Sequence, residues 1–404
     1  MMSEINRTNQ TQRIIKPGFP DFSDLPWELP LSHWQGVCDK LEEAPRGLSR
    51  HPVLFVNYDG TLYSLKELPG DSGKKEYDIL AKIENLHLPS VTPIGYALIS
   101  SPHNGLSSVL ITKYLDYSIP FRSLFIGAYL KRYQEHLLNS IAGLLVQLHL
   151  ADVFWGDCSL SNTLFRRDAG ALRAYLVDAE TAEIFPEGIS PTYRHDDLQI
   201  MEENITGELG DLAAEGLFSS EVPYSVAGAH IRLSYQRLWE EITHEDIINP
   251  NEHYRIQERI RALNDLGFSV GNVELQNTTG GNQLRFRVQV TDRNFHHDLL
   301  LNLTGIEAEE MQARKMINEI QELRAVLSQQ NNRSIPMSAA AYHWQRTIYD
   351  PTIERLKPYV KPDFDTAELY CQVLEHKWYM SEKAQRDVGH SVALEDYLQR
   401  IASK

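Results

Sequence analysis

Residues 149–165, HLADVFWGDCSLSNTLF, decide the fold of this 404-residue chain, because they place an acidic side chain and an amide on a loop directly after an apolar helix. The loop reads G-D-x-x-x-x-N and carries Asp157 and Asn162. Sixteen residues further on, the apolar run AYLVDAE brings in a second carboxylate, Asp178. Phosphoryl transfer needs one carboxylate to align the attacking hydroxyl, while an amide oxygen and a second carboxylate hold the Mg²⁺ that neutralises the phosphates. The spacing therefore predicts that these three groups meet in one cleft.

The segment upstream of this loop supplies a lysine and a glutamate in the order that a kinase uses. Runs of β-forming residues at 53–57 and 62–68 flank Asp59-Gly60, a strong signal for a tight turn, and so predict a hairpin. Lys66 lies in its second strand, and Glu76 lies at the start of a predicted helix over 74–86. The apolar face expected for that helix consists of Tyr77, Leu80, Ile83 and Leu86. In a kinase the strand lysine contacts the α- and β-phosphates and the helix glutamate orients it.

Two further extended runs, VTPIGYALI and SSVLITKYL, predict strands separated by the turn-forming segment SSPHNGL. Two strands, a helix and two strands make a small α+β lobe over residues 46–116. The segment LITKYLDYS stands where a kinase has its adenine-binding hinge, so Tyr114 and Leu115 are predicted to contact the nucleotide. Helical periodicity then dominates, most clearly in YQEHLLNSIAGLLVQLHL, and predicts a larger helical lobe over residues 117–266.

The two ends of the chain differ from this pattern. Residues 1–45 turn rich in proline and tryptophan, which favours an extended arm packed on a domain surface. Residues 267–404 begin with alternating apolar residues around Gly280-Gly281, predicting a hairpin, and continue as helices. The hairpin face is expected to hold Leu284, Phe286, Val288 and Val290. In RNFHHDLL, His296 and His297 would lie on a strand and point to opposite faces, which argues against a shared metal ion.

Composition narrows the possible partners and the compartment. The chain has 42% hydrophobic and 23% charged residues, which is ordinary for a globular protein, and its length predicts two or three structural units. A net charge of −16 argues against nucleic acid and anionic lipid surfaces. No apolar run approaches the roughly 20 residues of a spanning helix, and the polar start does not resemble a signal peptide. Three scattered cysteines suggest neither disulfides nor a zinc site. We therefore expect a cytoplasmic protein.

Residues from about 50 to 265 resemble the protein-kinase-like fold, most closely the branch of lipopolysaccharide-core, aminoglycoside and choline kinases, which carries H-G-D-x-x-x-x-N. The segments PWELPLSHW, RGLSRHPVLFV, FWGDCSLSNTLFRRDAGA, YLVDAET, LTGIEAEEMQAR and LYCQVLEHKW resemble a bacterial family known as a domain of unknown function with a lipopolysaccharide-kinase-like region. The resemblance implies an α+β, bilobal protein-kinase-like fold with an N-terminal extension and an additional mixed α/β C-terminal unit. It also implies that Asp157 is the catalytic base and that Asn162 and Asp178 are metal ligands. Lys66 would contact the phosphates, and Glu76 would be its partner.

The chain departs from the kinase pattern at three places. Trp155 replaces the usual histidine, whose role is chiefly architectural. Asp178-Ala179-Glu180 replaces D-F-G, which removes the phenylalanine switch and adds a carboxylate. No G-x-G-x-x-G loop precedes the first strand; only RGLSR does, in which Arg46 and Arg50 are candidate phosphate contacts.

These residues predict an Mg²⁺-dependent ATP phosphotransferase that acts on a hydroxyl group of a small molecule or a protein. Two alternatives stay open: nucleotidyl transfer on the same fold, or a non-catalytic nucleotide-binding module that engages a partner through residues 267–404. Simpler readings also exist for single residues. Asp157 and Asn162 occur often as turn caps, Lys66 and Glu76 would also suit a surface ion pair, and His149 is expected to be a hydrogen-bonded structural histidine. A carboxylate beside Cys158 argues against a reactive thiolate.

Overall fold

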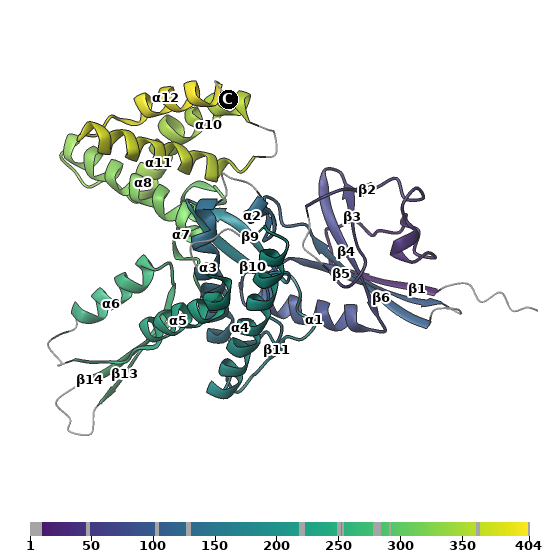
Figure 1. Cartoon of the computed structure of the whole chain (residues 1–404). Helices are drawn as coiled ribbons and strands as arrows, with labels where there is room; N and C mark the ends of the chain where they lie inside the picture. The colour runs from purple at the N-terminus through teal and green to yellow at the C-terminus, as the bar shows by residue number, and fades with distance from the viewer. Residues whose placement is uncertain are drawn as a thin grey trace, which may run out of the picture. The chain divides into compact units, whose positions relative to one another are not determined.

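The structure is a computed structural model of the whole chain, and Figure 1 shows how its helices and strands are arranged. It describes residues 10–45, 49–101, 105–126, 131–217, 223–248, 252, 254–277, 284–290, 292–360 and 364–402. Helices and strands are both abundant, which fits the mixed class expected from the sequence. The chain forms two compact units. The first consists of Met1–Arg166 and Ala174–Leu238, and the second of Arg167–Arg173 and Trp239–Lys404.

The first unit contains a six-stranded antiparallel sheet in the order β1-β5-β6-β4-β3-β2. Its centre is the predicted hairpin of β3 (Val53–Tyr58) and β4 (Thr61–Pro69), with Tyr58 opposite Thr61. The two turn residues, Asp59 and Gly60, have φ angles of 51° and 83°. Positive φ at both central positions is what a two-residue turn between twisted strands requires, so the Asp-Gly pair fixes the register. The expected strands β5 (Pro93–Ser101) and β6 (Gly105–Lys113) are also confirmed.

The N-terminal arm is part of the sheet and of its core. Strand β1 (Gln10–Ile15) pairs with β5 at one edge, and β2 (Leu41–Glu42) pairs with β3 at the other. Between them lies a short 3₁₀ turn, Leu31–His33. Phe22, Trp27 and Trp34 are at most 4% exposed and pack against residues of the central strands. The arm thus consists of two edge strands joined by turns, and its aromatic side chains form part of the core of the sheet.

Helix α1 (Ser72–Asn85) packs on the sheet, and Figure 1 shows it beside β5 and β6. Its buried residues are Gly73, Glu76, Leu80 and Ile83. The prediction that Leu86 belongs to this face is wrong, since Leu86 is 39% exposed. Each residue turns a helix by about 100°, so repeated steps of three drift around the axis, whereas alternating steps of three and four stay on one side. The alternating face places Glu76 toward the interior.

The remaining elements of the first unit are mainly helical. Helix α3 (Lys131–Leu150) buries the predicted stripe of Leu137, Ile141, Leu144, Leu145 and Leu148. The other elements that lie wholly or partly in this unit are α2 (Ser123–Ile126), α4 (Pro191–Ala214) and α5 (Tyr224–Thr243), with strands β7 (Ile119–Pro120), β8 (Val153–Phe154), β9 (Thr163–Asp168), β10 (Ala171–Leu176) and β11 (Glu183–Ile184). The strands form a three-stranded sheet, β10-β9-β7, and a two-stranded pair, β11-β8. The loop between β8 and β9 carries the G-D-x-x-x-x-N motif.

The second unit includes a small antiparallel sheet. Strand β12 (Asp246–Ile248) pairs with β14 (Leu284–Val290), which pairs with β13 (Val270–Asn277), and helix α6 (Tyr254–Asp265) contacts both long strands. The predicted hairpin is thus present, with Phe286 and Val288 buried. Gly280-Gly281 and the side chain of Leu284 lie outside the described residues. Because β12 completes the hairpin sheet, the segment before residue 267 is joined to this unit.

Helices complete the second unit. They are α7 (Phe295–Thr304), α8 (Glu310–Gln330), α9 (Met337–Trp344), α10 (Asp350–Leu356), α11 (Thr366–Ala384) and α12 (His390–Ala402), with a π-helical turn at Gln345–Tyr349 and a 3₁₀ turn at Lys357–Tyr359. Helices α8, α10 and α12 each pack against α11 or its neighbours, as Figure 1 shows.

The prediction of a strand at RNFHHDLL is wrong, because this segment forms the start of α7. The carboxylate of Glu310 accepts hydrogen bonds from the main-chain N–H groups of His296 and His297, which supplies acceptors at the helix N-terminus. The ring of His296 also bonds Glu310, and the ring of His297 bonds the carbonyl of Ala308 at 2.6 Å. Both histidine rings are therefore bonded within the second unit, and a negative charge at this helix end also suits the helix dipole.

The tip of the β9–β10 hairpin, residues 167–173, belongs to the second unit. The Asp168 carboxylate accepts from the Gln312 main-chain N–H at 2.8 Å. Ala169 donates to Glu368 at 3.0 Å and accepts from Lys315 at 2.9 Å. Asp168 is 4% exposed, and burial is the largest cause that raises its pKa to about 7. A hairpin tip is usually a solvent-exposed loop, whereas this one is bonded on both its main chain and its side chains.

Candidate active site

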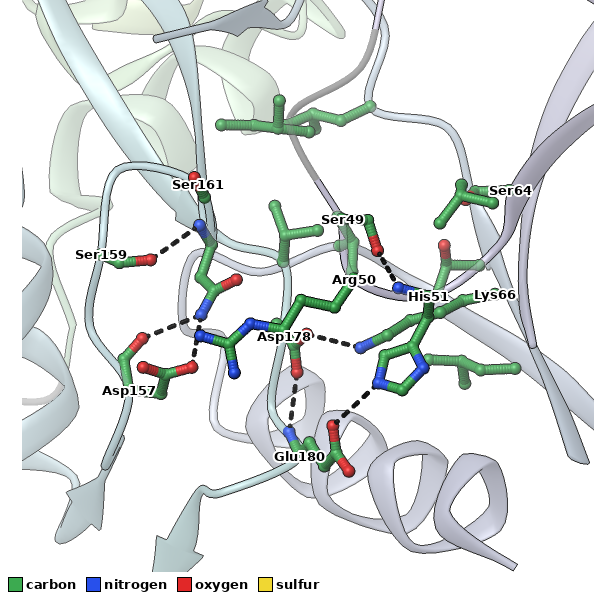
Figure 2. Close-up of a pocket in the computed structure, with 18 of the residues that line it drawn as sticks. Ser49, Arg50, His51, Ser64, Lys66, Asp157, Ser159, Ser161, Asp178 and Glu180 are labelled. Carbon is green, nitrogen blue, oxygen red and sulfur yellow. Dashed lines mark hydrogen bonds and ion pairs between the residues drawn. The ribbon is translucent and has the colours of Figure 1, made fainter. Parts of the chain in front are cut away.

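A cavity of about 460 Å³ lies in the first unit and brings together most of the residues singled out from the sequence. Its lining includes Lys66, Tyr114, Leu115, Asp157, Asn162 and Asp178. The volume is within the usual range of small-molecule sites. Figure 2 shows Asp157 and Asp178 on the same cavity, with the side chain of Lys66 reaching Asp178 from the opposite wall. The predicted meeting of the three polar groups in one cleft is therefore observed.

Lys66 joins the sheet, helix α1 and the end of β10. Its position on β4 is fixed by the hairpin register, which places it opposite Val53. The Lys66 ammonium lies 3.0 Å from Glu76 Oε2 and 2.6 Å from Asp178 Oδ2. The side chain of Lys66 is 13% exposed and that of Glu76 is 0% exposed. This is a buried cluster of charges and not a surface ion pair.

The electrostatics of this cluster follow from its burial. Burial lowers the pKa of Lys66, but the attraction of Glu76 and Asp178 outweighs it, so the pKa stands above its ordinary value. Burial is also the largest cause that raises the pKa of Glu76, and repulsion from Asp178 raises it further. These two effects outweigh the attraction of Lys66, so the pKa of Glu76 rises to about 7. The main-chain N–H of Ala179 donates to Glu76 at 3.2 Å. Glu76 thereby ties helix α1 to the segment that follows Asp178.

Asn162 is bonded to Asp157 within their shared loop. The Nδ2 atom of Asn162 donates to the Asp157 carboxylate Oδ2 at 2.9 Å and to the Asp157 carbonyl at 3.0 Å. The main-chain N–H of Asn162 donates to Ser159 Oγ at 3.1 Å. These bonds use the amide nitrogen and leave the amide oxygen as the group that a hard cation prefers. A role as turn caps alone does not account for Asp157 and Asn162, because both side chains also line the cavity.

Helix α4 anchors the start of this loop through Asp197, a fully buried carboxylate that the sequence reading overlooked. Asp197 accepts from the main-chain N–H groups of Trp155 at 2.8 Å and Gly156 at 3.0 Å. It also bonds the ring of His149 at 3.1 Å, whose other nitrogen lies 2.8 Å from the Tyr235 hydroxyl. The structural role predicted for His149 is confirmed. A buried charge with three partners is well satisfied, so it holds the loop in a defined position.

Trp155, at the place of the usual histidine, links the two acidic segments. Its indole Nε1 donates to the carbonyl of Asp178 at 2.9 Å. The Thr181 hydroxyl in turn donates to the Trp155 carbonyl at 2.9 Å. Gly156 has a φ of 76°, and an added Cβ would lie 2.8 Å from Phe154 and 3.0 Å from the Thr181 carbonyl, so this position requires glycine. Trp155 therefore connects the loop that carries Asp157 to the segment that carries Asp178.

The same helix α4 supplies two further polar side chains that sequence reasoning missed. Asn204 Nδ2 donates to Asp157 Oδ1 at 3.0 Å. Glu208 accepts from the main-chain N–H groups of Leu160 at 2.6 Å and Ser161 at 3.0 Å. Burial raises the pKa of Glu208. The available signal was the placement of Asp197, Asn204 and Glu208 at i, i+7 and i+11, which is one face of a helix whose neighbouring positions are apolar and buried.

The segment after β6 and the loop before β3 also contribute to the lining. Tyr114 and Leu115 both line the cavity, and the Tyr114 ring packs edge-to-face on Phe55 with centroids 5.5 Å apart. The main-chain N–H of Tyr114 donates to the Leu62 carbonyl at 2.9 Å, which holds this segment against β4. Their contact with adenine stays a prediction.

Residues at the altered D-F-G and glycine-loop positions face each other in the cavity. His51 Nε2 lies 3.8 Å from Glu180 Oε2, and Glu180 donates its main-chain N–H to Asp178 Oδ1 at 3.1 Å. Figure 2 shows Arg50 extending into the cavity. Arg46 and Gly47 lie outside the described residues. Cys158 is fully buried, and burial raises its pKa well above the usual value, which agrees with the prediction against a reactive thiolate.

The donor set near Asp178 suits a hard cation. Carboxylate and amide oxygens are the ligands that Mg²⁺ prefers, and Mg²⁺ in kinases takes only one or two protein ligands besides phosphate oxygens. In the part of the chain that the structure describes, no group of three or more His, Cys, Asp or Glu side chains is arranged to hold a metal ion. A metal at Asn162 and Asp178 thus fits the residues present only together with a phosphate ligand.

None of the described helices is long and apolar enough to cross a membrane.

Comparisons with known proteins match two separate stretches of the sequence. Residues 60–204 match the lipopolysaccharide kinase (Kdo/WaaP) family, and residues 237–402 match a domain of unknown function, DUF4032. A solved structure described as WaaP in complex with acyl carrier protein is 15% identical, with a TM-score of 0.34, and the similarity covers 57% of this chain and 98% of that chain. No curated protein matches the sequence. The resemblance inferred from the motifs is confirmed for both stretches.

Proposed function

We propose that this protein is an Mg²⁺-dependent phosphotransferase that moves the γ-phosphoryl group of ATP to a hydroxyl acceptor. The observation that carries the proposal is the ammonium of Lys66 between Glu76 and Asp178, in a cavity that Asp157 and Asn162 also line. This is the set of groups that phosphoryl transfer requires. The match of residues 60–204 to a kinase family supports the same reading. In this proposal residues 46–116 and 117–266 act as the two lobes of a kinase-like body.

Each residue has a role that follows from its position. Adenine would lie against the hinge residues Tyr114 and Leu115, and Lys66 would contact the α- and β-phosphates. Arg50 extends into the cavity and is the cation that would take over phosphate contacts in the absence of a glycine-rich loop. Asn162 and Asp178 would hold Mg²⁺, which neutralises phosphate charge when bound.

Asp157 would align the acceptor hydroxyl for in-line attack. The acceptor oxygen forms a bond to the γ-phosphorus as the bond from that phosphorus to the bridging oxygen breaks. The electron pair of the broken bond leaves with ADP, and the hydroxyl proton passes to the Asp157 carboxylate. Asp157 then returns the proton to water, so the atoms and charges balance with ATP and the acceptor as the only reactants.

The test is product analysis with Mg²⁺-ATP and purified protein. ADP release that falls at least about 100-fold in Asp157→Asn supports the proposal, because a positioned general base contributes roughly 10² to 10⁴ in rate. Asp196→Asn is the matched control, since it removes an exposed carboxylate from α4 and should keep the wild-type rate. Release of pyrophosphate would instead identify nucleotidyl transfer. Tight nucleotide binding without any turnover would identify a non-catalytic nucleotide-binding module.

A further inference from the structure

Helix α4 holds the loop of residues 155–162 at three points along its length. Asp197 binds the main chain at the start of the loop, and Glu208 binds it near the end. Asn204 lies between them and bonds the side-chain carboxylate of Asp157. Its Nδ2 atom also donates to the Cys158 carbonyl at 3.2 Å. The helix therefore acts both on the path of the loop and on one functional side chain.

The Asp157 carboxylate is held at both of its oxygens by neutral amides. Asn204 Nδ2 lies 3.0 Å from Oδ1, and Asn162 Nδ2 lies 2.9 Å from Oδ2. One donor would leave the carboxylate free to turn about its χ2 angle, which has a broad energy profile. Two donors from opposite sides restrict that rotation. Asn162 belongs to the same loop as Asp157, whereas Asn204 belongs to a helix, so Asn204 is the donor that relates the carboxylate to a rigid element.

We propose that Asn204 is a positioning residue that fixes the rotamer of Asp157 for attack by the acceptor; this inference rests on the phosphotransferase function proposed above. An ionised carboxylate has about four lone-pair positions, and the two amide bonds leave the others for the acceptor hydroxyl. A neutral amide can orient the carboxylate without adding a positive charge, which would weaken the affinity of the carboxylate for the acceptor proton. Asn204 and Asp157 both line the cavity, so the orientation is set where the acceptor must bind.

Two variants and one control test the inference. Asn204→Leu removes the donor with little change in size. Asn204→Asp keeps the shape but replaces the donor with an acceptor, and serves where Asn204→Leu folds poorly. Gln199→Leu makes the same kind of change on an exposed position of α4, where the amide bonds only Glu203. ADP release from Mg²⁺-ATP with water as the acceptor gives kcat and KM, nucleotide titration gives Kd, and a crystal structure of each variant gives the Asp157 rotamer.

The expected result is a loss of kcat of about 100-fold in both Asn204 variants, since a misplacement of about 1 Å can cost this much. The Kd and KM for ATP should stay within about twofold of wild type, because the phosphate and adenine contacts do not involve Asn204. The Asp157 carboxylate should turn or occupy more than one rotamer, while Gln199→Leu matches wild type. A merely structural role would instead change stability and nucleotide affinity together.

Two results would overturn the inference: wild-type kcat in both Asn204 variants, or an Asp157 carboxylate that keeps its position in their crystal structures. If wild-type protein releases no ADP, the proposed function fails, and the crystal structures alone then decide whether Asn204 fixes Asp157. A turned carboxylate in that case supports the positioning contact, and an unmoved one refutes it. The two failures are therefore distinguishable.

Discussion

Replacing Glu76 by glutamine tests whether burial or the ion pair with Lys66 governs this carboxyl group. Glu76 is 1% exposed, and burial with repulsion from Asp178 raises its pKa from 4.5 to about 7. Between these pH values the folded chain keeps a proton that the unfolded chain releases. The resulting stabilisation is complete below pH 4.5 and is lost as the pH rises through 7. A difference of about 2.5 in pKa corresponds to about 3 kcal/mol.

Urea unfolding between pH 4.5 and 8, followed by tryptophan fluorescence, measures this effect. Glutamine has the shape of the protonated acid and does not titrate. The free energy of unfolding of the wild type should therefore fall by about 3 kcal/mol relative to that of Glu76→Gln across this range. Asp78→Asn removes an exposed carboxylate from the same helix and should show no comparable change. A wild type that gains stability relative to Glu76→Gln with rising pH would refute the reasoning, because the ion pair would then outweigh burial.

Two further predictions concern the metal ligand and the loop anchor. Mg²⁺-ATP at a hundred times its Kd should stabilise the wild type by about 2.7 kcal/mol and raise its thermal midpoint. Asp178→Ala should lose this shift, whereas Asp196→Ala should keep it. An undiminished shift in Asp178→Ala would show that Asp178 is not a metal ligand. Asp197→Ala should lower the free energy of unfolding by about 3 kcal/mol or more, because it leaves buried N–H groups without an acceptor. Urea unfolding beside Asp196→Ala checks this, and equal stability of the two variants would contradict it.

Elements with a strong local signal could be predicted from the sequence. The β3–β4 hairpin depends on two residues, Asp59 and Gly60, whose positive φ angles are set by the turn itself. Helix α3 depends on its own apolar stripe. In both cases the decisive interactions lie between residues close in sequence, so the pattern and the structure agree.

Elements that depend on distant partners could not be predicted in the same way. Strand β1 exists because β5, 80 to 90 residues further along the chain, offers an edge with which it can pair. The segment RNFHHDLL forms a helix because Glu310, beyond the end of that helix, accepts from its first N–H groups. In neither segment does the local sequence pattern alone determine the secondary structure.

The residues of the candidate site also fall into those that the sequence predicts and those that depend on distant partners. Lys66, Asp157, Asn162 and Asp178 could be named because their spacing reflects the chemistry of phosphoryl transfer. The contacts of Asn204 with Asp157 join residues 47 positions apart, and no motif relates them. Asp197, Asn204 and Glu208 had only one shared sign, which is polarity on a helix face flanked by buried apolar residues. Polar side chains in such a place need a partner, but the sequence does not say which one.

The hairpin tip at residues 167–173 has a consequence for how this protein can be divided and recombined. The match to the kinase family runs to residue 204 and the match to the second family starts at residue 237, so a cut between them looks natural on the linear sequence. Such a cut would leave the second fragment without residues 167–173, among them Asp168 and Ala169, which bond Gln312, Lys315 and Glu368. A C-terminal unit exchanged between relatives must therefore bring a compatible tip with it, inserted between the strands that precede and follow it. The second unit is thus encoded in two places, one of them inside the sequence of the first.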